Sequence, residues 1–217
     1  MYHENCLVIF SIIVFCFVGC KQKTPATNTI ILDSSQGTNK VIKKDSSSNA
    51  LVFHKVLNLQ NISYQLSAIG NGSIQKLVIV PIGFTSIMDT ITMTSDPVVG
   101  AEIEDLDHDG YPELLIYTQS AGSGSYGHVL GFSPNKGKSI SPIYFPELGP
   151  NSTEAKGYKG HDEFSIVESS LARRFPCFES TDTNAKSTGK LRQLQYKLKN
   201  GEASKKFVLV GSVEFAK

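Results

Sequence analysis

Residues 101–133 read AEIEDLDHDGYPELLIYTQSAGSGSYGHVLGFS, and this stretch decides the fold. It joins an acidic turn, the apolar run Leu114–Tyr117, a glycine–serine loop and the segment His128–Phe132. Apolar, β-branched and aromatic residues favour strands on both sides of the loop, and Gly and Ser favour a turn between them. We therefore expect a β-hairpin with the glycine–serine loop at its tip.

The rest of the chain repeats short apolar runs between turns, and it lacks the spacing of an amphipathic helix. Ile62–Ser67 alternates apolar and polar residues, as a half-buried strand does. Further strands are expected at Leu51–Val56, Leu77–Val80, Ile87–Thr94, Val98–Ile103, Ser139–Phe145, Phe164–Val167, Leu171–Phe178, Leu191–Leu198 and Phe207–Phe215. The charges of Arg173 and Arg174 indicate a sheet edge, and Thr181–Lys190 is expected to be a polar connection. The predicted fold class is all-β, an antiparallel β-sandwich or barrel-like single domain.

The N-terminal residues differ from the rest of the chain. Cys6–Val18 is an uncharged apolar run, shorter than the span of about 20 residues that crosses a membrane, and it is typical of a signal-peptide core. Gly19-Cys20 resembles a bacterial lipobox, which implies removal of residues 1–19 and lipidation of Cys20. Because residues 1–5 contain no Lys or Arg, an uncleaved anchor and an ordinary secretory signal stay open as alternatives. The expected location is the cell envelope, as a membrane-anchored lipoprotein facing the periplasm or the cell surface.

After the N-terminal apolar run, the amino-acid composition divides the chain into an expected tether and an expected folded domain. Residues 20–50 are rich in Ser, Thr, Asn and Lys and are expected to be a flexible tether, followed by a β-rich domain at 51–217. The formal net charge of +1 gives no sign of nucleic-acid binding, so membrane contact is expected only through the lipid. In the processed chain Cys177 would have no cysteine to pair with, and we expect a buried, unreactive thiol.

The acidic turn has the residue order of a calcium loop, with carboxylates at alternate positions before Gly110. The expected ligands are Asp105, Asp107, Asp109, Tyr111 through its carbonyl, and Glu113. Ile116 occupies the place of the bidentate Glu of an EF-hand, so the turn resembles the DxDxDG loops between strands of integrin-type repeats instead. A metal-free turn, in which Asp side chains accept hydrogen bonds from their own backbone amides, is the alternative. Either form would pin a hairpin.

The segment Ser120–Gly127 holds three glycines, three serines and Tyr126. It lacks the Lys and the following helix of a phosphate loop, and a hairpin does not suit a nucleophile elbow, so no catalytic residue is expected. One interpretation is a flexible hairpin loop. The other is a protruding contact loop, in which glycines allow close approach, serines donate hydrogen bonds and Tyr126 supplies contact area. Arg192 is a candidate for supporting such a loop.

A family resemblance favours the contact loop. Asp105–Phe132, with Gly157–Phe164, Arg173–Pro176 and Leu191–Tyr196, resembles the bacterial periplasmic inhibitors of invertebrate-type (I-type) lysozyme. The resemblance covers roughly Leu51–Phe215, most of the mature domain, and implies an all-β inhibitor that inserts a serine- and tyrosine-containing loop into the lysozyme cleft. The residues that it assigns to the partner-binding loop are Ser123 and Tyr126, with Gly122, Gly124 and Ser125 shaping the loop.

We therefore expect a non-enzymatic inhibitor of I-type lysozyme that protects peptidoglycan, with the lysozyme as its protein partner and no required cofactor. A lipoprotein binding module of the integrin-repeat kind, braced by Ca²⁺, is the alternative. A cell-wall hydrolase is a third hypothesis, and the sequence shows no paired acid and base to support it.

Overall fold

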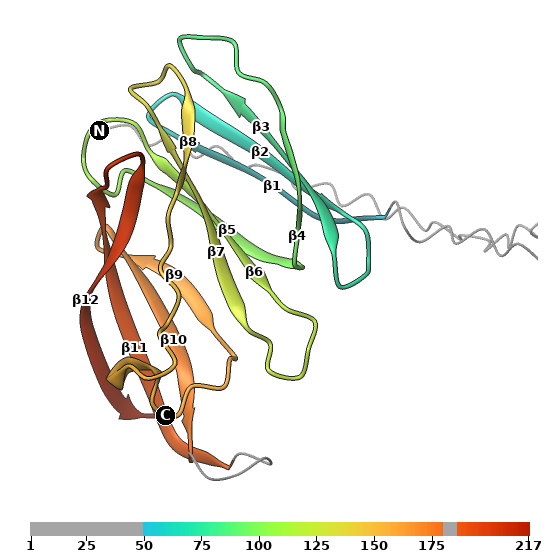
Figure 1. Ribbon diagram of the computed structural model, residues 1–217. Coiled ribbons are helices and arrows are strands. Elements are labelled where there is room, and N and C mark those ends of the chain that lie inside the picture. Colours follow the sequence, from blue (N-terminus) through green and yellow to red (C-terminus); the bar gives the residue numbers. More distant parts are fainter. Residues whose placement is uncertain (1–49, 180–185) are drawn as a thin grey trace, which may run out of the picture. The chain divides into compact units, whose positions relative to one another are not determined.

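A computed structural model describes residues 50–179 and 186–217, which belong to one compact unit. Among these residues, twelve strands and one short 3-10 turn, η1 (Thr153–Ala155), make up the regular structure (Figure 1). The expected all-β class is confirmed. The expected signal peptide at 1–19, the lipidation site at Cys20 and the tether as far as residue 49 lie outside the described residues.

The strands form three four-stranded antiparallel sheets, each built from strands that follow one another in the chain. The N-terminal sheet contains β1 (Leu51–Leu59), β2 (Ile62–Ile69), β3 (Gln75–Ile82) and β4 (Ile91–Ser95). The central sheet contains β5 (Val98–Glu104), β6 (Glu113–Gln119), β7 (Gly127–Pro134) and β8 (Ile140–Ile143). The C-terminal sheet contains β9 (Glu163–Val167), β10 (Ser170–Phe178), β11 (Ser187–Asn200) and β12 (Lys205–Ala216). The sheets pack together and none closes into a barrel.

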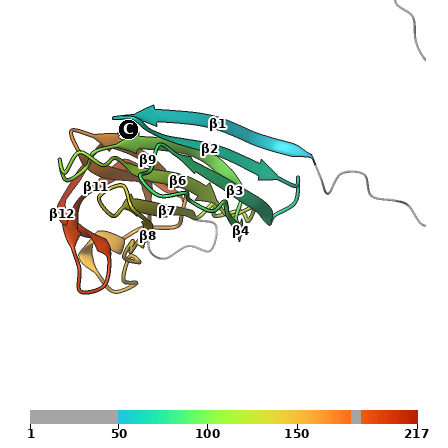
Figure 2. The same cartoon turned by 90° about the horizontal axis from the view of Figure 1, so that it is seen from above.

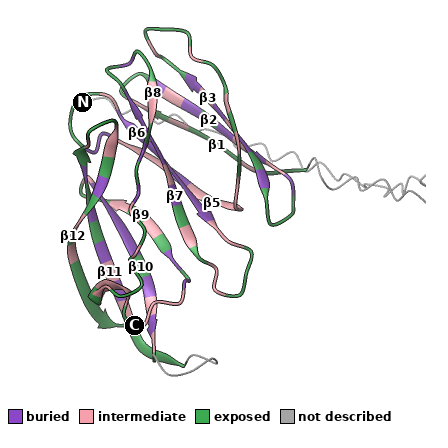
Figure 3. Ribbon diagram, viewed as in Figure 1, coloured by how far each residue is buried: buried purple, intermediate pink, exposed green. Residues whose placement is uncertain are grey.

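The central sheet has a hydrophobic core on each face. Leu114 and Ile116 of β6 pack in a cluster with residues of the N-terminal sheet, and Leu115 and Tyr117 pack in a second cluster with residues of the C-terminal sheet. Side chains alternate across a strand, so β6 contributes to both cores and is buried along nearly its whole length (Figure 3). This double burial explains why Leu114–Tyr117 is a continuous apolar run. By contrast, β1 lies at the edge of the N-terminal sheet (Figure 2). Most of its residues are exposed.

The expected hairpin is present. β6 and β7 pair in antiparallel register from Leu114 opposite Phe132 to Gln119 opposite Gly127. The glycine–serine loop therefore lies at the end of two interior strands of the central sheet. Next to the loop, β6 pairs with β5 on one side and β7 on the other, whereas β8 pairs with β7 only from Gly131 to Pro134.

Two expectations about the C-terminal sheet were wrong. β10 is not an edge strand, because it pairs with β9 on one side and β11 on the other. Arg173 lies inside the sheet at 4% exposure, and only Arg174 is exposed. A charged residue can occupy this position because Asp162, 11 residues earlier in the chain, supplies a buried partner. The polar connection is also shorter than Thr181–Lys190, since β11 begins at Ser187.

Candidate functional site

The contact loop, residues Gly122–Tyr126, has a backbone fixed by its own hydrogen bonds. The amide of Ser125 donates to the carbonyl of Gly122 over 2.9 Å, and Ser125 has a left-handed φ of 43°. At the base of the loop, the Ser120 amide donates to the Tyr126 carbonyl over 2.8 Å. The Tyr126 amide donates in return to Ser120 Oγ over 2.9 Å. These bonds close the loop across the end of the hairpin.

Ser123 and Tyr126 lie on the solvent side of the loop. Ser123 is exposed, and Tyr126 is 51% exposed. The ring of Tyr126 lies over Gly124 so closely that a Cβ at Gly124 would overlap its Cε2 and Cδ2 atoms. Gly124 therefore lets the ring of Tyr126 fold back over the loop.

The segment Tyr158–Asp162 supports the loop from beneath. The amide of His161 donates to the carbonyls of Gly124 and Ser125 over 2.8 and 3.1 Å. Gly160 has a φ of 84°, and a Cβ there would collide with the Gly124 carbonyl, so only glycine fits this approach. The Gly127 amide donates to Asp162 Oδ2 over 2.7 Å. The structure thus brings together two segments that the family resemblance had picked out separately.

A buried ionic network lies under this support. Arg173 Nε donates to Asp162 Oδ1 over 2.8 Å, with side-chain exposures of 5% and 0%. Arg173 Nη2 donates to the Tyr158 hydroxyl over 2.6 Å, and that hydroxyl donates to Asp162 Oδ2 over 2.7 Å. The ring of Tyr158 meets the ring of Tyr126 edge-on at 5.7 Å. Contacts therefore run without a break from the buried arginine to the exposed tyrosine.

The protonation states of this network suit its geometry. Burial acts to lower the pKa of Arg173, but the hydrogen bond and the charge of Asp162 outweigh burial and raise it. Burial, together with the hydrogen bond to Asp162, raises the pKa of Tyr158. Arg173 stays charged and Tyr158 stays protonated at neutral pH, so each hydrogen bond has its donor.

Arg192, which sequence reasoning assigned to the loop, lies elsewhere. Its Nη1 donates to the carbonyls of Thr153, Glu154 and Lys156, and its Nη2 forms an ion pair with Glu214 at 2.7 Å. It therefore fixes the η1 turn, and the arginine beneath the loop is Arg173. The sequence does indicate that Arg173 is buried. In a strand, side chains two residues apart lie on the same face, so Arg173 shares the inward face of the apolar Leu171 and Phe175.

The acidic turn between β5 and β6 holds its own backbone. Asp105 is buried, its Oδ1 accepts from the Asp109 amide over 3.0 Å, and its Oδ2 accepts from the Gly110 amide over 2.9 Å. Glu113, 0% exposed, accepts from the Leu106 amide over 2.9 Å. These bonds match the expected turn in which carboxylates satisfy nearby amides, and they pin the β5–β6 hairpin.

Lys205, at the start of β12, places its ammonium among the carboxylates of this turn. Nζ lies 2.6 Å from Asp107 Oδ2, 3.2 Å from Asp109 Oδ2 and 3.0 Å from Glu113 Oε1. The lysine is distant in sequence, and no local pattern points to it. It joins the central sheet to the C-terminal sheet through charge-assisted hydrogen bonds.

The same turn could also hold a metal ion. Oxygen atoms of Asp105, Asp107 and Asp109 lie within 4.8 Å of one another, and carboxylate oxygens suit a hard cation such as Ca²⁺. The carboxylates are the kind of ligand that Ca²⁺ prefers, but three Asp residues supply fewer than the about six to eight oxygens that the ion takes. Both oxygens of Asp105 already accept backbone amides, and Lys205 uses oxygens of Asp107 and Asp109. Calcium binding stays a prediction, and a bound ion would have to share these oxygens with the ammonium.

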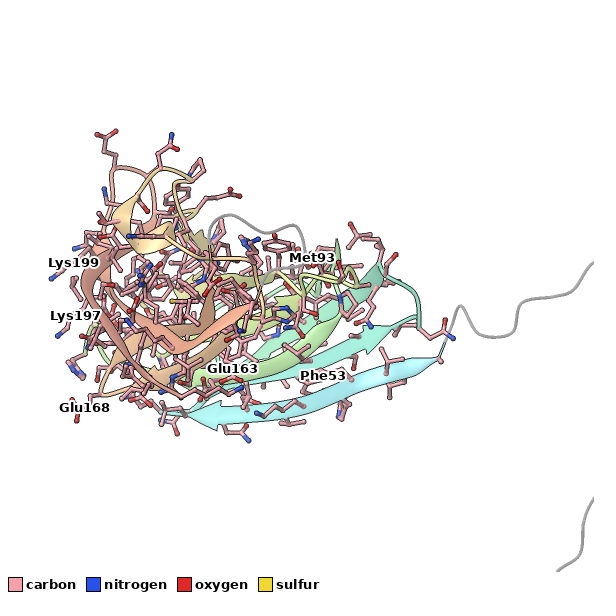
Figure 4. The ribbon with its side chains drawn as sticks, turned by 90° about the horizontal axis from the view of Figure 1, so that it is seen from below. Phe53, Met93, Glu163, Glu168, Lys197 and Lys199 are labelled. Carbon is pink, nitrogen blue, oxygen red and sulfur yellow. The ribbon has the colours of Figure 1, made fainter. Side chains whose placement is uncertain are left out.

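Replacement of Lys205 should therefore reveal the cation preference of the turn. We expect Lys205→Met to bind Ca²⁺ about tenfold or more tightly than the natural chain, because one positive charge is removed from beside the carboxylates. Calorimetric titration measures both affinities. Lys199→Met is the control, since Lys199 projects from β11 into solvent (Figure 4). Equal titrations of the natural chain and Lys205→Met would show that Lys205 does not compete with the ion.

Alkaline pH should reduce the stability that Lys205 gives the fold through the carboxylates of the acidic turn. Burial acts to lower the pKa of Lys205, but the hydrogen bonds that its ammonium donates to Asp107 and Glu113 outweigh burial and raise the pKa. A lysine with a raised pKa stabilises the fold below its unfolded pKa of about 10.4, and this contribution is lost as pH rises through the folded pKa. We expect Lys205→Met to lower the free energy of unfolding by about 3 kcal/mol at neutral pH, because buried Glu113 loses its cation. Urea denaturation at increasing pH should show this difference constant from about pH 7 to about pH 10 and shrinking above that range. A difference that grows with alkaline pH would contradict the assignment.

The fold and the site together define an all-β domain that presents a braced, uncharged loop at the end of a buried hairpin. No family model, curated protein or solved structure matches this chain. Among residues 50–179 and 186–217, no helix has the length and apolar character to cross a membrane.

Proposed function

We propose that this protein is a non-enzymatic inhibitor of I-type lysozyme, and that the contact loop enters the active-site cleft of the enzyme. The observation that carries the proposal is the loop itself, which is exposed, rich in hydrogen-bond donors and held in one conformation by the residues beneath it. The resemblance of Asp105–Phe132 to inhibitors of I-type lysozyme supplies the identity of the partner.

The donors of the loop suit a cleft that contains carboxylates. Within the part of the chain that the structure describes, the amides of Gly122, Ser123 and Gly124 donate to no acceptor. The hydroxyls of Ser123 and Tyr126 make no hydrogen bond there either. A lysozyme cleaves its substrate with two carboxyl groups, and free donors placed between them would form charge-assisted hydrogen bonds. The loop brings no charge of its own that would repel either carboxylate.

Preorganisation favours tight binding by such a small loop. A flexible loop loses conformational entropy when it binds, whereas a loop already closed by hydrogen bonds loses less. The support from His161 and Asp162 lets the loop keep its shape outside the complex. Tyr126 then contributes contact area with few torsions left to fix.

To test the proposal, the activities of an I-type lysozyme and of lysozymes of other classes are measured in the presence of the purified protein. Each measurement is made with and without a calcium chelator. Inhibition of an I-type enzyme in both conditions supports the proposal. Full activity of I-type enzymes at a large excess of the protein would overturn it. Inhibition of other lysozyme classes to the same degree would overturn the assignment of the partner.

A second candidate is a binding module braced by Ca²⁺, favoured by the cluster of oxygens from Asp105, Asp107 and Asp109. Its binding surface would depend on the metal. Loss of binding to a carbohydrate or protein target on chelation, with no lysozyme inhibition, would select this candidate.

We also propose that the inhibitor is a lipoprotein of the cell envelope, anchored through Cys20. The basis is the lipobox-like junction Gly19-Cys20 after an apolar run. Cys20→Ala should move the protein from the membrane fraction to the soluble fraction and should abolish incorporation of labelled fatty acid. Cys16→Ala is the matched control, and it should leave both unchanged. Membrane retention of Cys20→Ala with unaltered labelling would contradict the lipid anchor.

A further inference from the structure

We propose that a cavity beside the contact loop binds the side chain of an arginine or lysine on the partner. The cavity has a volume of about 320 Å³, at the lower end of the range for small-ligand sites. Its wall includes Tyr126 and Gly127 from the loop side, Asp96, Glu147 and, deeper, Arg173. The identity of the partner as a lysozyme rests on the proposed function, whereas the chemistry of the cavity does not.

The charge of the cavity is negative. Asp96 and Glu147 form no hydrogen bond or ion pair with any of the described residues, so both carboxylates are free to meet a cation. Arg173, the cation in the wall, is already neutralised by Asp162 at 2.8 Å. An anionic ligand would approach two unpaired carboxylates, and an apolar ligand would remove them from water without a partner. A cationic ligand is therefore the class that suits the unpaired carboxylates of this cavity.

Aromatic rings strengthen the preference for a cation. Tyr126, Tyr158 and Phe145 line the cavity, and the first two rings meet edge-on at 5.7 Å. A guanidinium or ammonium group over such rings is attracted by their negative faces. Arg173 already makes this contact from within the protein, with its guanidinium carbon 4.8 Å from the centre of the Tyr158 ring. Carboxylates beside aromatic rings provide both kinds of contact that a basic side chain uses.

The position of the cavity relates it to the contact loop. Ser120, Tyr126 and Gly127 belong both to the base of the loop and to the wall of the cavity. A partner that takes the loop into its cleft therefore places the rim of that cleft next to the cavity. A basic residue on the rim would enter the cavity while the loop fills the cleft, which would add specificity to a loop that carries no charge.

The experiment is an NMR titration of the full chain with Nα-acetylarginine amide and Nα-acetyllysine amide. Nα-acetylcitrulline amide, which has the shape of arginine without its charge, is the control ligand. Saturable shifts of the Gly127 and His128 amides are expected with the charged ligands, and none with citrulline. Asp96→Asn with Glu147→Gln should weaken this binding by about tenfold or more. The matched control is Asp89→Asn with Glu202→Gln, which removes two exposed carboxylates outside the cavity and should leave the affinity unchanged.

The outcomes separate this inference from the proposed function. Charge-dependent binding that the cavity variant loses supports the cavity even if the protein inhibits no lysozyme. Equal shifts with citrulline, unsaturable shifts, or equal loss in both double variants would overturn it even if inhibition is strong. With an I-type lysozyme that the natural chain inhibits, the cavity variant should inhibit less well and with a weaker dependence on salt than the natural chain.

Discussion

Ser123→Ala combined with Tyr126→Ala should abolish inhibition of I-type lysozyme while the protein stays folded. Ser123 is exposed, whereas Tyr126 is half exposed and its ring meets that of Tyr158, so the free energy of unfolding should fall by roughly 1 kcal/mol, mostly from the lost ring contact. Ser123 and Tyr126 both supply donors to the proposed interface, and Tyr residues at the centre of interfaces often contribute most of the binding energy. We expect a loss of roughly 3 kcal/mol in binding, about two orders of magnitude in the inhibition constant.

The control for this variant changes the same residue types away from the loop. Ser73 and Tyr144 are exposed and line neither the loop nor the cavity beside it. Ser73→Ala with Tyr144→Ala should inhibit as well as the natural chain. Thermal unfolding and near-ultraviolet circular dichroism establish that both variants are folded. A folded Ser123→Ala, Tyr126→Ala protein that still inhibits at the original concentration would show that the loop is not the inhibitory element.

Arg173→Leu should cause the largest loss of stability of the variants described for this protein. It leaves the Asp162 carboxylate, whose side chain is fully buried, without its cation and removes a donor to Tyr158. Removing one member of a buried ion pair lowers the free energy of unfolding by about 3–5 kcal/mol. Chemical denaturation measures this loss directly. The folded fraction should also inhibit less well, because Asp162 and Tyr158 support the loop.

The adjacent arginine provides a matched control. Arg174 is exposed, its Nη2 donates to Gln193 Oε1 over 2.7 Å, and it has no buried partner. Arg174→Leu should change the free energy of unfolding by roughly 0.5 kcal/mol or less. Equal losses of stability in the two variants would mean that the buried network does not stabilise the domain.

Local patterns in the sequence predicted the strands well because each strand carries its own signal. Every expected strand overlaps an observed one, and the hairpin around the glycine–serine loop has the expected partners. The expected and observed ends of a strand differ most where the exposure of its residues changes along the segment. Ile87, expected in a strand, is fully exposed, and β4 begins only at Ile91.

The remaining features depend on contacts that local patterns do not encode. Lys205 is 96 residues from Asp109 in the sequence. The sequence of the turn alone therefore suggested a metal ion, whereas the fold places an ammonium group there. Arg173 was assigned to an edge because charge usually marks exposure, and its partner Asp162 lies on another segment. Buried ion pairs of this kind become visible only when the packing of the sheets is known.

The most direct test of the proposed inhibition is a set of initial rates of an I-type lysozyme at several substrate concentrations and several concentrations of the purified protein. A loop that fills the cleft competes with substrate. The apparent KM should therefore rise with inhibitor concentration while kcat stays constant, and the inhibition should saturate. Unchanged KM and kcat at a large excess of the protein would contradict the proposed function.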